Sequence, residues 1–293
     1  MTSGGGAGAE ALVVRVSGPT ATLLLDGGER EARLPPRLPG RPVVAGDRVA
    51  VRRAGGDLVV ERIAPRASRL DRGQGFERRP RPLVANADLL LVVASVVDPE
   101  LRPRLIDRYL VAGHAGGLDG GIVITKTDLP HDAGELERVA GRYRDAGYRV
   151  LMGAATGDEL PRRVRELVSG RVAVLAGPSG VGKSTLTRAL TGVERAVGEI
   201  SAKARTGRHT TTDPRLIPLP GGGAIVDTAG VRTFHLPALD ARAIEAGFPE
   251  IAAAARDCRF RGCRHDGEAG CAVPGRVSDE RLDSYRRMIH DLA

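Results

Sequence analysis

The chain has 293 residues, of which 42% are hydrophobic and 27% charged, a composition that excludes fully disordered and fibrous proteins and allows two or three domains. It contains 44 Lys and Arg against 36 Asp and Glu, and the resulting net charge of +8 favours a polyanionic partner. Aromatic residues make up only 3% and Trp is absent, so a nucleic-acid surface here would depend on charge more than on base stacking.

Residues 1–11 predict a flexible tail, because they contain neither the basic nor the apolar region of a signal peptide. The longest apolar run, residues 89–97, is too short to cross a bilayer. All three Cys lie between positions 258 and 271, which favours a metal site in a reducing compartment over a disulfide framework. We therefore expect a cytoplasmic protein with no membrane partner.

Residues 12–66 predict a small all-β barrel, because short β-type runs alternate there with Gly, Pro and Asp turns. The Gly46-Asp47 turn before an alternating strand fits an oligonucleotide-binding (OB) barrel, although periodicity alone does not separate it from other five-stranded barrels. The Arg-rich residues 67–82 are expected to form a basic linker, which either meets phosphates or is simply solvated.

From residue 83 to residue 239 the pattern predicts an α/β domain with a parallel sheet, because apolar strands alternate with charged helices. Strands are expected at residues 87–97, 121–125, 148–153, 171–176 and 224–227. Helices are expected at residues 101–115, 135–146, 160–168 and 184–190. Residues 240–293 predict a small helical unit that closes on an amphipathic helix at residues 279–292.

The strongest motif is GPSGVGKS at residues 177–184, which matches GxxxxGK[ST] between a predicted strand and a predicted helix. In such a loop the glycines let backbone N–H groups surround the phosphates, Lys183 balances the β and γ charge, and Ser184 ligates Mg²⁺. A structural Gly-rich turn is the weaker alternative. The expected phosphate-binding residues are Gly177, Pro178, Ser179, Gly180, Val181, Gly182, Lys183, Ser184 and Thr185.

A guanine-reading element is predicted at the end of the strand that precedes residue 125, where TKTD is a variant of NKxD. Its residues are Thr125, Lys126, Thr127 and Asp128. Asp128 can accept from guanine N1–H and N2–H, a pairing that adenine does not offer, and each such bond contributes about 1.5–3 kcal/mol. Thr125 in place of Asn removes an amide. Gly153 and Ala154 are expected to form the loop whose Ala N–H meets guanine O6, with Gly where Ser is usual.

Two further motifs predict the magnesium and γ-phosphate contacts. In DTAG, Asp227 is expected near Mg²⁺ and the N–H of Gly230 near the γ-phosphate. GRHTTT at residues 207–212 is typical of a switch I loop, in which one Thr hydroxyl, assigned here to Thr211, completes the Mg²⁺ shell. A polar turn is the alternative for this segment.

The order of these motifs predicts a circularly permuted GTPase, because the base-reading elements precede the phosphate loop, switch I and DTAG. The C-terminal unit then follows the switch region directly, which couples the two in our hypothesis. Val231 stands where Ras-like proteins place a water-orienting Gln, so intrinsic hydrolysis should be slow. His209 is the candidate catalytic residue that orients water, and a hydrogen-bonded surface role is the equal alternative.

The cysteine window predicts a tetrahedral, structural zinc site of the Cys₃His type. The four protein ligands would fill the coordination shell and leave no open catalytic position. The expected ligands are Cys258, Cys263, His265 and Cys271.

A barrel, a permuted GTPase with GPSGVGKST, GRHTTT and DTAG, and the tail CRFRGCRHDGEAGC together resemble the ribosome small-subunit-dependent GTPase A family, over nearly the whole chain from residue 12. TKTD, DTAG, Gly-Ala and Glu-Ala-Gly-Cys depart from the usual family forms. The resemblance implies a GTPase that binds GTP and GDP with Mg²⁺, carries one Zn²⁺, acts late in maturation of the small ribosomal subunit and contacts its rRNA. It further implies stimulation by the subunit and release after hydrolysis, and we expect a monomer.

Two alternatives come from other functional classes. A metabolic P-loop kinase would phosphorylate a small acceptor, but it would not need TKxD, DxxG or the permuted order. An RNA-binding scaffold would hold nucleotide only as a structural ligand, with negligible turnover, and Val231 is compatible with that alternative. Stimulation by ribosomal subunits would distinguish the scaffold from the GTPase.

Overall fold

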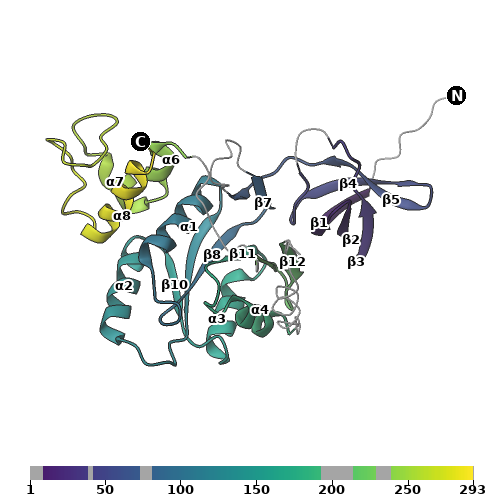
Figure 1. Cartoon of the computed structure of the whole chain (residues 1–293), viewed down its shortest axis with the longest axis horizontal. Coiled ribbons are helices and arrows are strands. Elements are labelled where there is room, and N and C mark those ends of the chain that lie inside the picture. The colour runs from purple at the N-terminus through teal and green to yellow at the C-terminus, as the bar shows by residue number, and fades with distance from the viewer. Residues whose placement is uncertain (1–8, 39–41, 73–80, 193–213, 229–238, 293) are drawn as a thin grey trace, which may run out of the picture.

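The computed structural model describes residues 9–38, 42–72, 81–192, 214–228 and 239–292. Within these ranges, none of the helices combines the length and the apolar character that a membrane crossing requires. The N-terminal barrel and the C-terminal helices lie on opposite sides of a central α/β domain (Figure 1).

The N-terminal part is the predicted five-stranded barrel, and it is closed. Its strands are β1 (Ala9–Ser17), β2 (Thr20–Leu25), β3 (Gly28–Arg33), β4 (Arg48–Ala54) and β5 (Asp57–Ile63). They pair in the order β1-β2-β3-β5-β4, with β4 returning to β1, which is a Greek-key arrangement. Alternate side chains such as Val13, Leu23 and Val60 fill the interior, so the period-two pattern of the sequence explains the core.

The segment predicted as a linker contains paired strands. β6 (Arg69–Arg72) and β7 (Arg81–Ala85) form an antiparallel pair, in which Leu70 and Val84 are buried. Just before it, Arg66 makes a bidentate ion pair with the buried Asp47 of the barrel, at 2.7 Å for both Nε to Oδ1 and Nη2 to Oδ2. This pair links the barrel to the segment that follows β5.

The central domain contains a six-stranded sheet in the order β10-β9-β8-β11-β13-β12. Its strands are β8 (Leu89–Ser95), β9 (Asp119–Thr125), β10 (Arg149–Met152), β11 (Val172–Ala176), β12 (Arg215–Pro218) and β13 (Ala224–Asp227). The five predicted strands are confirmed and run parallel, and β8 is buried along its whole length. β12 was not predicted; it is an antiparallel edge strand that ends on Pro218, a residue that weakens the sequence signal for a strand.

Helices cover both faces of this sheet, as the sequence predicts for a parallel sheet. α1 (Pro103–Ala115) and α2 (Ala133–Asp145) pack on one face. α3 (Glu159–Val168) and α4 (Lys183–Thr191) pack on the other. The layers are therefore helix, sheet and helix, with the sheet at the centre of the core.

The C-terminal unit consists of α6 (Ala241–Ala246), α7 (Pro249–Ala255), α8 (Asp279–His290) and the loops between them. Its core includes Phe248 and Tyr285, whose rings meet edge to face with centroids 5.7 Å apart. Val111 of α1 belongs to the same core although it lies in the central domain. The unit therefore packs directly against α1.

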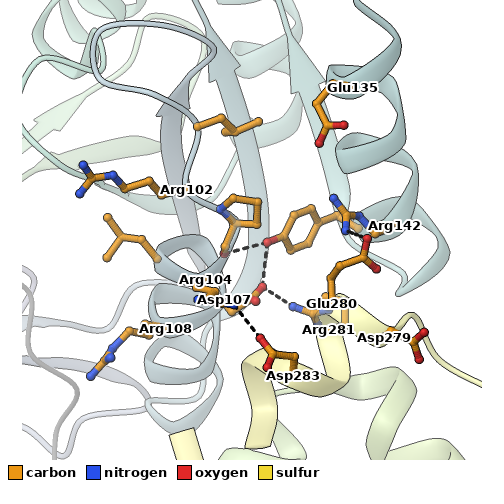
Figure 2. Close-up of a pocket in the computed structure, with 14 residues that line it drawn as sticks. Arg102, Arg104, Asp107, Arg108, Glu135, Arg142, Asp279, Glu280, Arg281 and Asp283 are labelled. Atoms are coloured by element: carbon orange, nitrogen blue, oxygen red, sulfur yellow. Dashed lines mark hydrogen bonds and ion pairs between the residues drawn. The ribbon is translucent and has the colours of Figure 1, made fainter. Parts of the chain in front are cut away.

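A buried ion pair fixes this contact. Arg281 of α8 and Asp107 of α1 are 4% and 1% exposed, and the Arg281 guanidinium donates to the Asp107 carboxylate (Figure 2). Arg281 Nε also donates to Glu250 at 2.6 Å, and Tyr143 Oη donates to Asp107 at 2.8 Å. Burial raises the pKa of Asp107, and the neighbouring Arg281 opposes that shift. The guanidinium lies 4.5 Å from the centroid of Phe248, which adds a cation–π contact to the ion pair.

A cleft of about 910 Å³ opens beside this ion pair, between α1, α2 and α8. Two ion pairs cross it: the exposed pair of Arg104 and Asp283, at 2.8 Å, and the pair of the half-buried Arg142 with the exposed Glu280, at 2.5 Å. These pairs add contacts between the central domain and the C-terminal unit, but exposed pairs contribute little each.

Replacing Arg281 by Met should lower the free energy of unfolding by about 3–5 kcal/mol, because Asp107 would be left buried without its cation. Arg104→Met is the matched control on the exposed pair with Asp283 and should cost about 1 kcal/mol or less. Urea denaturation of the three proteins measures both values, and equal losses for the two variants would contradict the structural role of Arg281.

Candidate functional site

The predicted nucleotide motifs meet at one edge of the sheet. β8, β9, β10, β11 and β13 are parallel, so the loops that leave their carboxyl ends lie side by side. The TKTD loop follows β9, residues 153–154 follow β10, the phosphate loop follows β11, and Asp227 ends β13. The permuted chain order therefore produces a contiguous site.

The phosphate loop leads from β11 directly into the N-terminus of α4. Gly177 allows this turn, because a Cβ atom there would lie 2.1 Å from the carbonyl oxygen of Val93. α4 begins at Lys183, so the free N–H groups of its first turn point to the loop. The geometry is that of an anion-binding site at a helix N-terminus.

Lys183 lies within this loop and is held by its carbonyl groups. Its Nζ donates to the carbonyl oxygens of Gly177 at 2.8 Å and Pro178 at 2.6 Å. Burial lowers the pKa of Lys183, and the charge of Asp227 opposes the shift. A partly desolvated ammonium group next to free helix N–H groups is suited to bind the β- and γ-phosphates.

Asp227 lies at the same edge of the sheet as the phosphate loop. It ends β13, the strand that pairs with β11. It is 1% exposed and lies in register with Leu175 of β11. The next residue, Thr228, donates its hydroxyl to the carbonyl oxygen of Leu175 at 2.7 Å, which fixes the end of β13. The Asp227 carboxylate and the Ser184 hydroxyl carry oxygen atoms of the kind that Mg²⁺ prefers as ligands.

The switch elements lie outside the described residues. These are His209, Thr211, Gly230 and Val231, with the rest of residues 207–212. Their predicted roles in magnesium binding, γ-phosphate contact and water orientation remain predictions.

Thr125 joins the base-reading loop to the phosphate loop. Its side chain is fully buried, and Oγ1 lies 2.7 Å from the carbonyl oxygen of Val181 and 3.1 Å from that of Ala94. From the sequence, Thr in place of Asn predicts only the loss of an amide. The structure shows that the hydroxyl bridges the two loops, a role that no local pattern indicates.

The remaining base-reading residues are arranged around this contact. Asp128 is exposed and free to face a ligand, whereas Lys126 Nζ donates to the carbonyl oxygen of Asp98. Asp98 belongs to the loop after β8, which sequence reasoning missed. Glu100, at the end of this loop, lines a small cavity together with Pro178 and Val181 of the phosphate loop. The β8 loop therefore borders both nucleotide loops.

The close packing around Gly153 explains why the loop after β10 contains Gly-Ala where Ser-Ala is usual. A Cβ atom at this position would lie 2.9 Å from Cβ of Leu160, at the start of α3. Its N–H donates to the carbonyl oxygen of Ile124 at 3.1 Å, so the loop is fixed close to the TKTD segment. Ala154 follows it and is half-buried. Serine at position 153 would require α3 to move.

The four predicted metal ligands form one cluster. The ligand atoms of Cys258, Cys263, His265 and Cys271 all lie within 4.8 Å of one another. Nδ1 of His265 is 3.3 Å from Sγ of Cys271 and 3.7 Å from Sγ of Cys258. Ligand atoms around a tetrahedral zinc ion are about 3.5–3.8 Å apart, given Zn–S and Zn–N distances of about 2.3 and 2.0 Å. The cluster fits Zn²⁺.

Contacts outside the cluster orient its ligands. Nε2 of His265 lies 3.2 Å from the Glu245 carboxylate, so its Nδ1 is the atom that faces the three sulfurs. The N–H of Ala272 donates to Sγ of Cys258 at 3.3 Å. The sequence did not predict the role of Glu245, because this residue lies on α6 and has no fixed spacing from the cysteines.

Glu268 holds the loop that carries two of the ligands. Its carboxylate accepts the N–H groups of Arg264 and Asp266, both at 2.7 Å. Desolvation raises its pKa, but these backbone hydrogen bonds outweigh it and lower the pKa to about 2. An ionised carboxylate thus closes the turn around His265.

The sequence is similar to a described family and to known proteins. A model of the RsgA GTPase family matches residues 63–237. The chain is 36% identical over 264 residues to the small ribosomal subunit biogenesis GTPase RsgA of Haemophilus influenzae, covering 86% of this chain and 76% of that protein. The protein of the same name from Dickeya dadantii is 38% identical over 267 residues, with the same coverage.

Two solved structures share the fold. The crystal structure of YloQ, a circularly permuted GTPase, aligns with a TM-score of 0.75 and 24% identity, covering 100% of this chain and 97% of that one. The crystal structure of YjeQ from Thermotoga maritima aligns with a TM-score of 0.75 and 26% identity, covering 97% and 98% of the two chains. The predicted circular permutation is therefore confirmed at the level of the fold.

Thr125→Val should weaken GTP binding, because it removes the hydroxyl that joins the two nucleotide loops while keeping the shape of the side chain. Loss of one such buried hydrogen bond costs about 1–3 kcal/mol, hence roughly 5- to 150-fold in affinity if the whole cost falls on binding. Thr125→Ser keeps the hydroxyl and is the control. Titration with a fluorescent GTP analogue measures both variants, and equal affinities for Val and Ser would refute the bridge.

Glu245→Gln should reduce zinc affinity by about 10- to 100-fold, because it replaces the carboxylate that contacts His265. Glu280→Gln, an exposed acidic residue on α8, is the control and should leave zinc affinity unchanged. Competition with a chromogenic chelator measures the affinity, and metal analysis of the wild type should find one zinc per chain. A wild type that is purified without chelator and contains no zinc would contradict the metal site itself.

Proposed function

Since this chain belongs to the RsgA GTPase family and is a GTPase, we propose that it acts on the small ribosomal subunit during late maturation. In this proposal the subunit stimulates GTP hydrolysis, and the protein leaves once GDP has formed. The observation that supports it best is the assembly of the TKTD loop, the phosphate loop and Asp227 at one sheet edge. Base reading and phosphate binding are joined there by Thr125.

Guanine recognition is assigned to the loops after β9 and β10. Asp128, exposed in the loop after β9, accepts from N1–H and N2–H of the base. The N–H of Ala154 donates to O6, because Gly153 holds its loop close to Ile124. Thr127 and Lys126 complete the pocket wall, with Lys126 anchored on Asp98.

Phosphate binding is assigned to residues 177–185, whose N–H groups surround the β-phosphate at the start of α4. Lys183 exchanges its loop carbonyl partners for β- and γ-phosphate oxygens and stabilises the charge that develops on them. Mg²⁺, when bound, neutralises the same oxygens. Ser184 and Thr211 would hold it, with Asp227 close by, and Gly230 would donate its N–H to the γ-phosphate.

The need for stimulation follows from the residue after DTAG. Val231 carries no polar group to orient the attacking water, so turnover by the free protein should be slow. His209 is our candidate for this role in the switch I loop. The subunit is proposed to place His209 next to the water.

RNA binding is assigned to arginine rather than to lysine. The barrel exposes arginine side chains on several strands: Arg15, Arg48, Arg52, Arg53 and Arg62. Arginine pairs with phosphate through two parallel N–H groups, which suits the shape of folded rRNA. We propose that the protein acts as a monomer in the cytoplasm, where subunits mature.

Phosphate release from GTP and from ATP, with and without isolated small or large ribosomal subunits, tests the proposal. We expect GTP-selective hydrolysis that small subunits accelerate by at least tenfold and large subunits do not. Asp128→Ala should abolish the selectivity, whereas Asp145→Ala, an exposed acidic residue at the end of α2, should not. Equal, unstimulated rates with both nucleotides would favour the scaffold function instead.

A further inference from the structure

Phe260 is the exception among the aromatic side chains that the structure describes. It is 56% exposed, whereas the others are buried or half-buried. Those others are Tyr109, Tyr143, Tyr148, Phe248 and Tyr285. In a chain with only 3% aromatic residues, Phe260 leaves in water a ring that would stabilise a core if it were buried.

The ring is presented by a fixed loop. Phe260 lies between Cys258 and Cys263, two members of the cluster that fits zinc, so both ends of its loop are anchored. The N–H of Arg259 donates to the carbonyl oxygen of Gly270 at 3.0 Å, which ties the same loop to the segment before Cys271. A ring held in this way loses little conformational entropy on binding a partner.

The surroundings of the ring are strongly basic. Arg256, Arg259, Arg261 and Arg264 are exposed on the same loop, and the Arg259 guanidinium lies 5.3 Å from the centroid of Phe260. Within the described part of the chain, no ion pair involves these four arginines, whereas the neighbouring acids have partners. Asp257 pairs with Arg276, Glu268 accepts two backbone N–H groups, and Asp266 pairs with Arg286 and His290.

We propose that Phe260 stacks on an unpaired base of RNA, while the surrounding arginines contact the flanking phosphates. A flat apolar ring among uncompensated cations matches the two parts of a nucleotide, its base and its phosphate. A protein partner fits less well, because it would have to cover the ring with an apolar pocket while leaving four cations unpaired or supplying as many acids. The proposal rests on the proposed function only in naming rRNA of the small subunit as the physiological RNA.

Because the chain lacks Trp, Phe260→Trp creates a single fluorescent reporter at the site. Stacking on a base should quench its emission when poly(A) is added, and heparin, a polyanion without bases, should not. This readout is independent of GTP hydrolysis, so it reports on stacking even if subunits fail to stimulate the enzyme. Emission that stays unchanged at saturating poly(A), or a wild type that does not bind poly(A), overturns the proposal.

Affinity measurements with matched variants complete the test. Phe260→Ala should weaken binding to poly(A) by about 5- to 150-fold, the effect of losing one stacked base, and leave heparin binding unchanged. Leu292→Ala removes another exposed apolar side chain and should have no effect. Both variants should keep the unstimulated GTPase rate and the zinc content of the wild type. Weaker binding of Phe260→Ala to small subunits with unchanged affinity for poly(A) would overturn the RNA contact in favour of a protein surface.

Discussion

The parallel alignment of five strands is the constraint on which the nucleotide site depends. Because parallel strands expose all their carboxyl ends at one edge, the loops after β9, β10, β11 and β13 converge whatever their order in the chain. Convergence alone does not fix the distances between loops. That is done by short contacts such as the Thr125 hydroxyl on Val181 and the approach of Gly177 to Val93. The strand topology brings the functional loops together, and a few close contacts set the distances between them.

Much of this architecture follows from local patterns. Residues 177–184 and the cysteine window carry fixed spacings imposed by phosphate and metal chemistry, so they are visible in sequence. The strand β8 is visible because it is apolar throughout. What sequence did not reveal depends on contacts between distant residues. Glu245 meets His265 across 20 positions, the pairing of β6 with β7 lies in an Arg-rich segment, and the role of Thr125 requires the neighbouring loop.

The helix α1 connects the two sites more directly than the chain order indicates. Its N-terminus follows the β8 loop, in which Asp98 receives Lys126 of the base-reading loop. About one turn into the helix, the Asp107 carboxylate accepts a hydrogen bond from Arg281 of the C-terminal unit. The loop that leads into α1 thus contacts the base-reading loop, and α1 itself packs against the C-terminal unit. The sequence predicted a link through the switch region, and the structure adds this second route among the described residues.

The place of Val111 has a consequence for how the protein unfolds. This residue of α1 completes the core of the C-terminal unit, while its neighbour Leu110 belongs to the core of the central domain. A helix shared by two cores makes them one cooperative unit, so the two parts should melt in a single transition. A truncated protein that ended before α6 would expose Val111 to water and would lack Arg281, the cation that pairs with Asp107. An ion that binds only the folded C-terminal unit therefore raises the melting temperature of the nucleotide site as well.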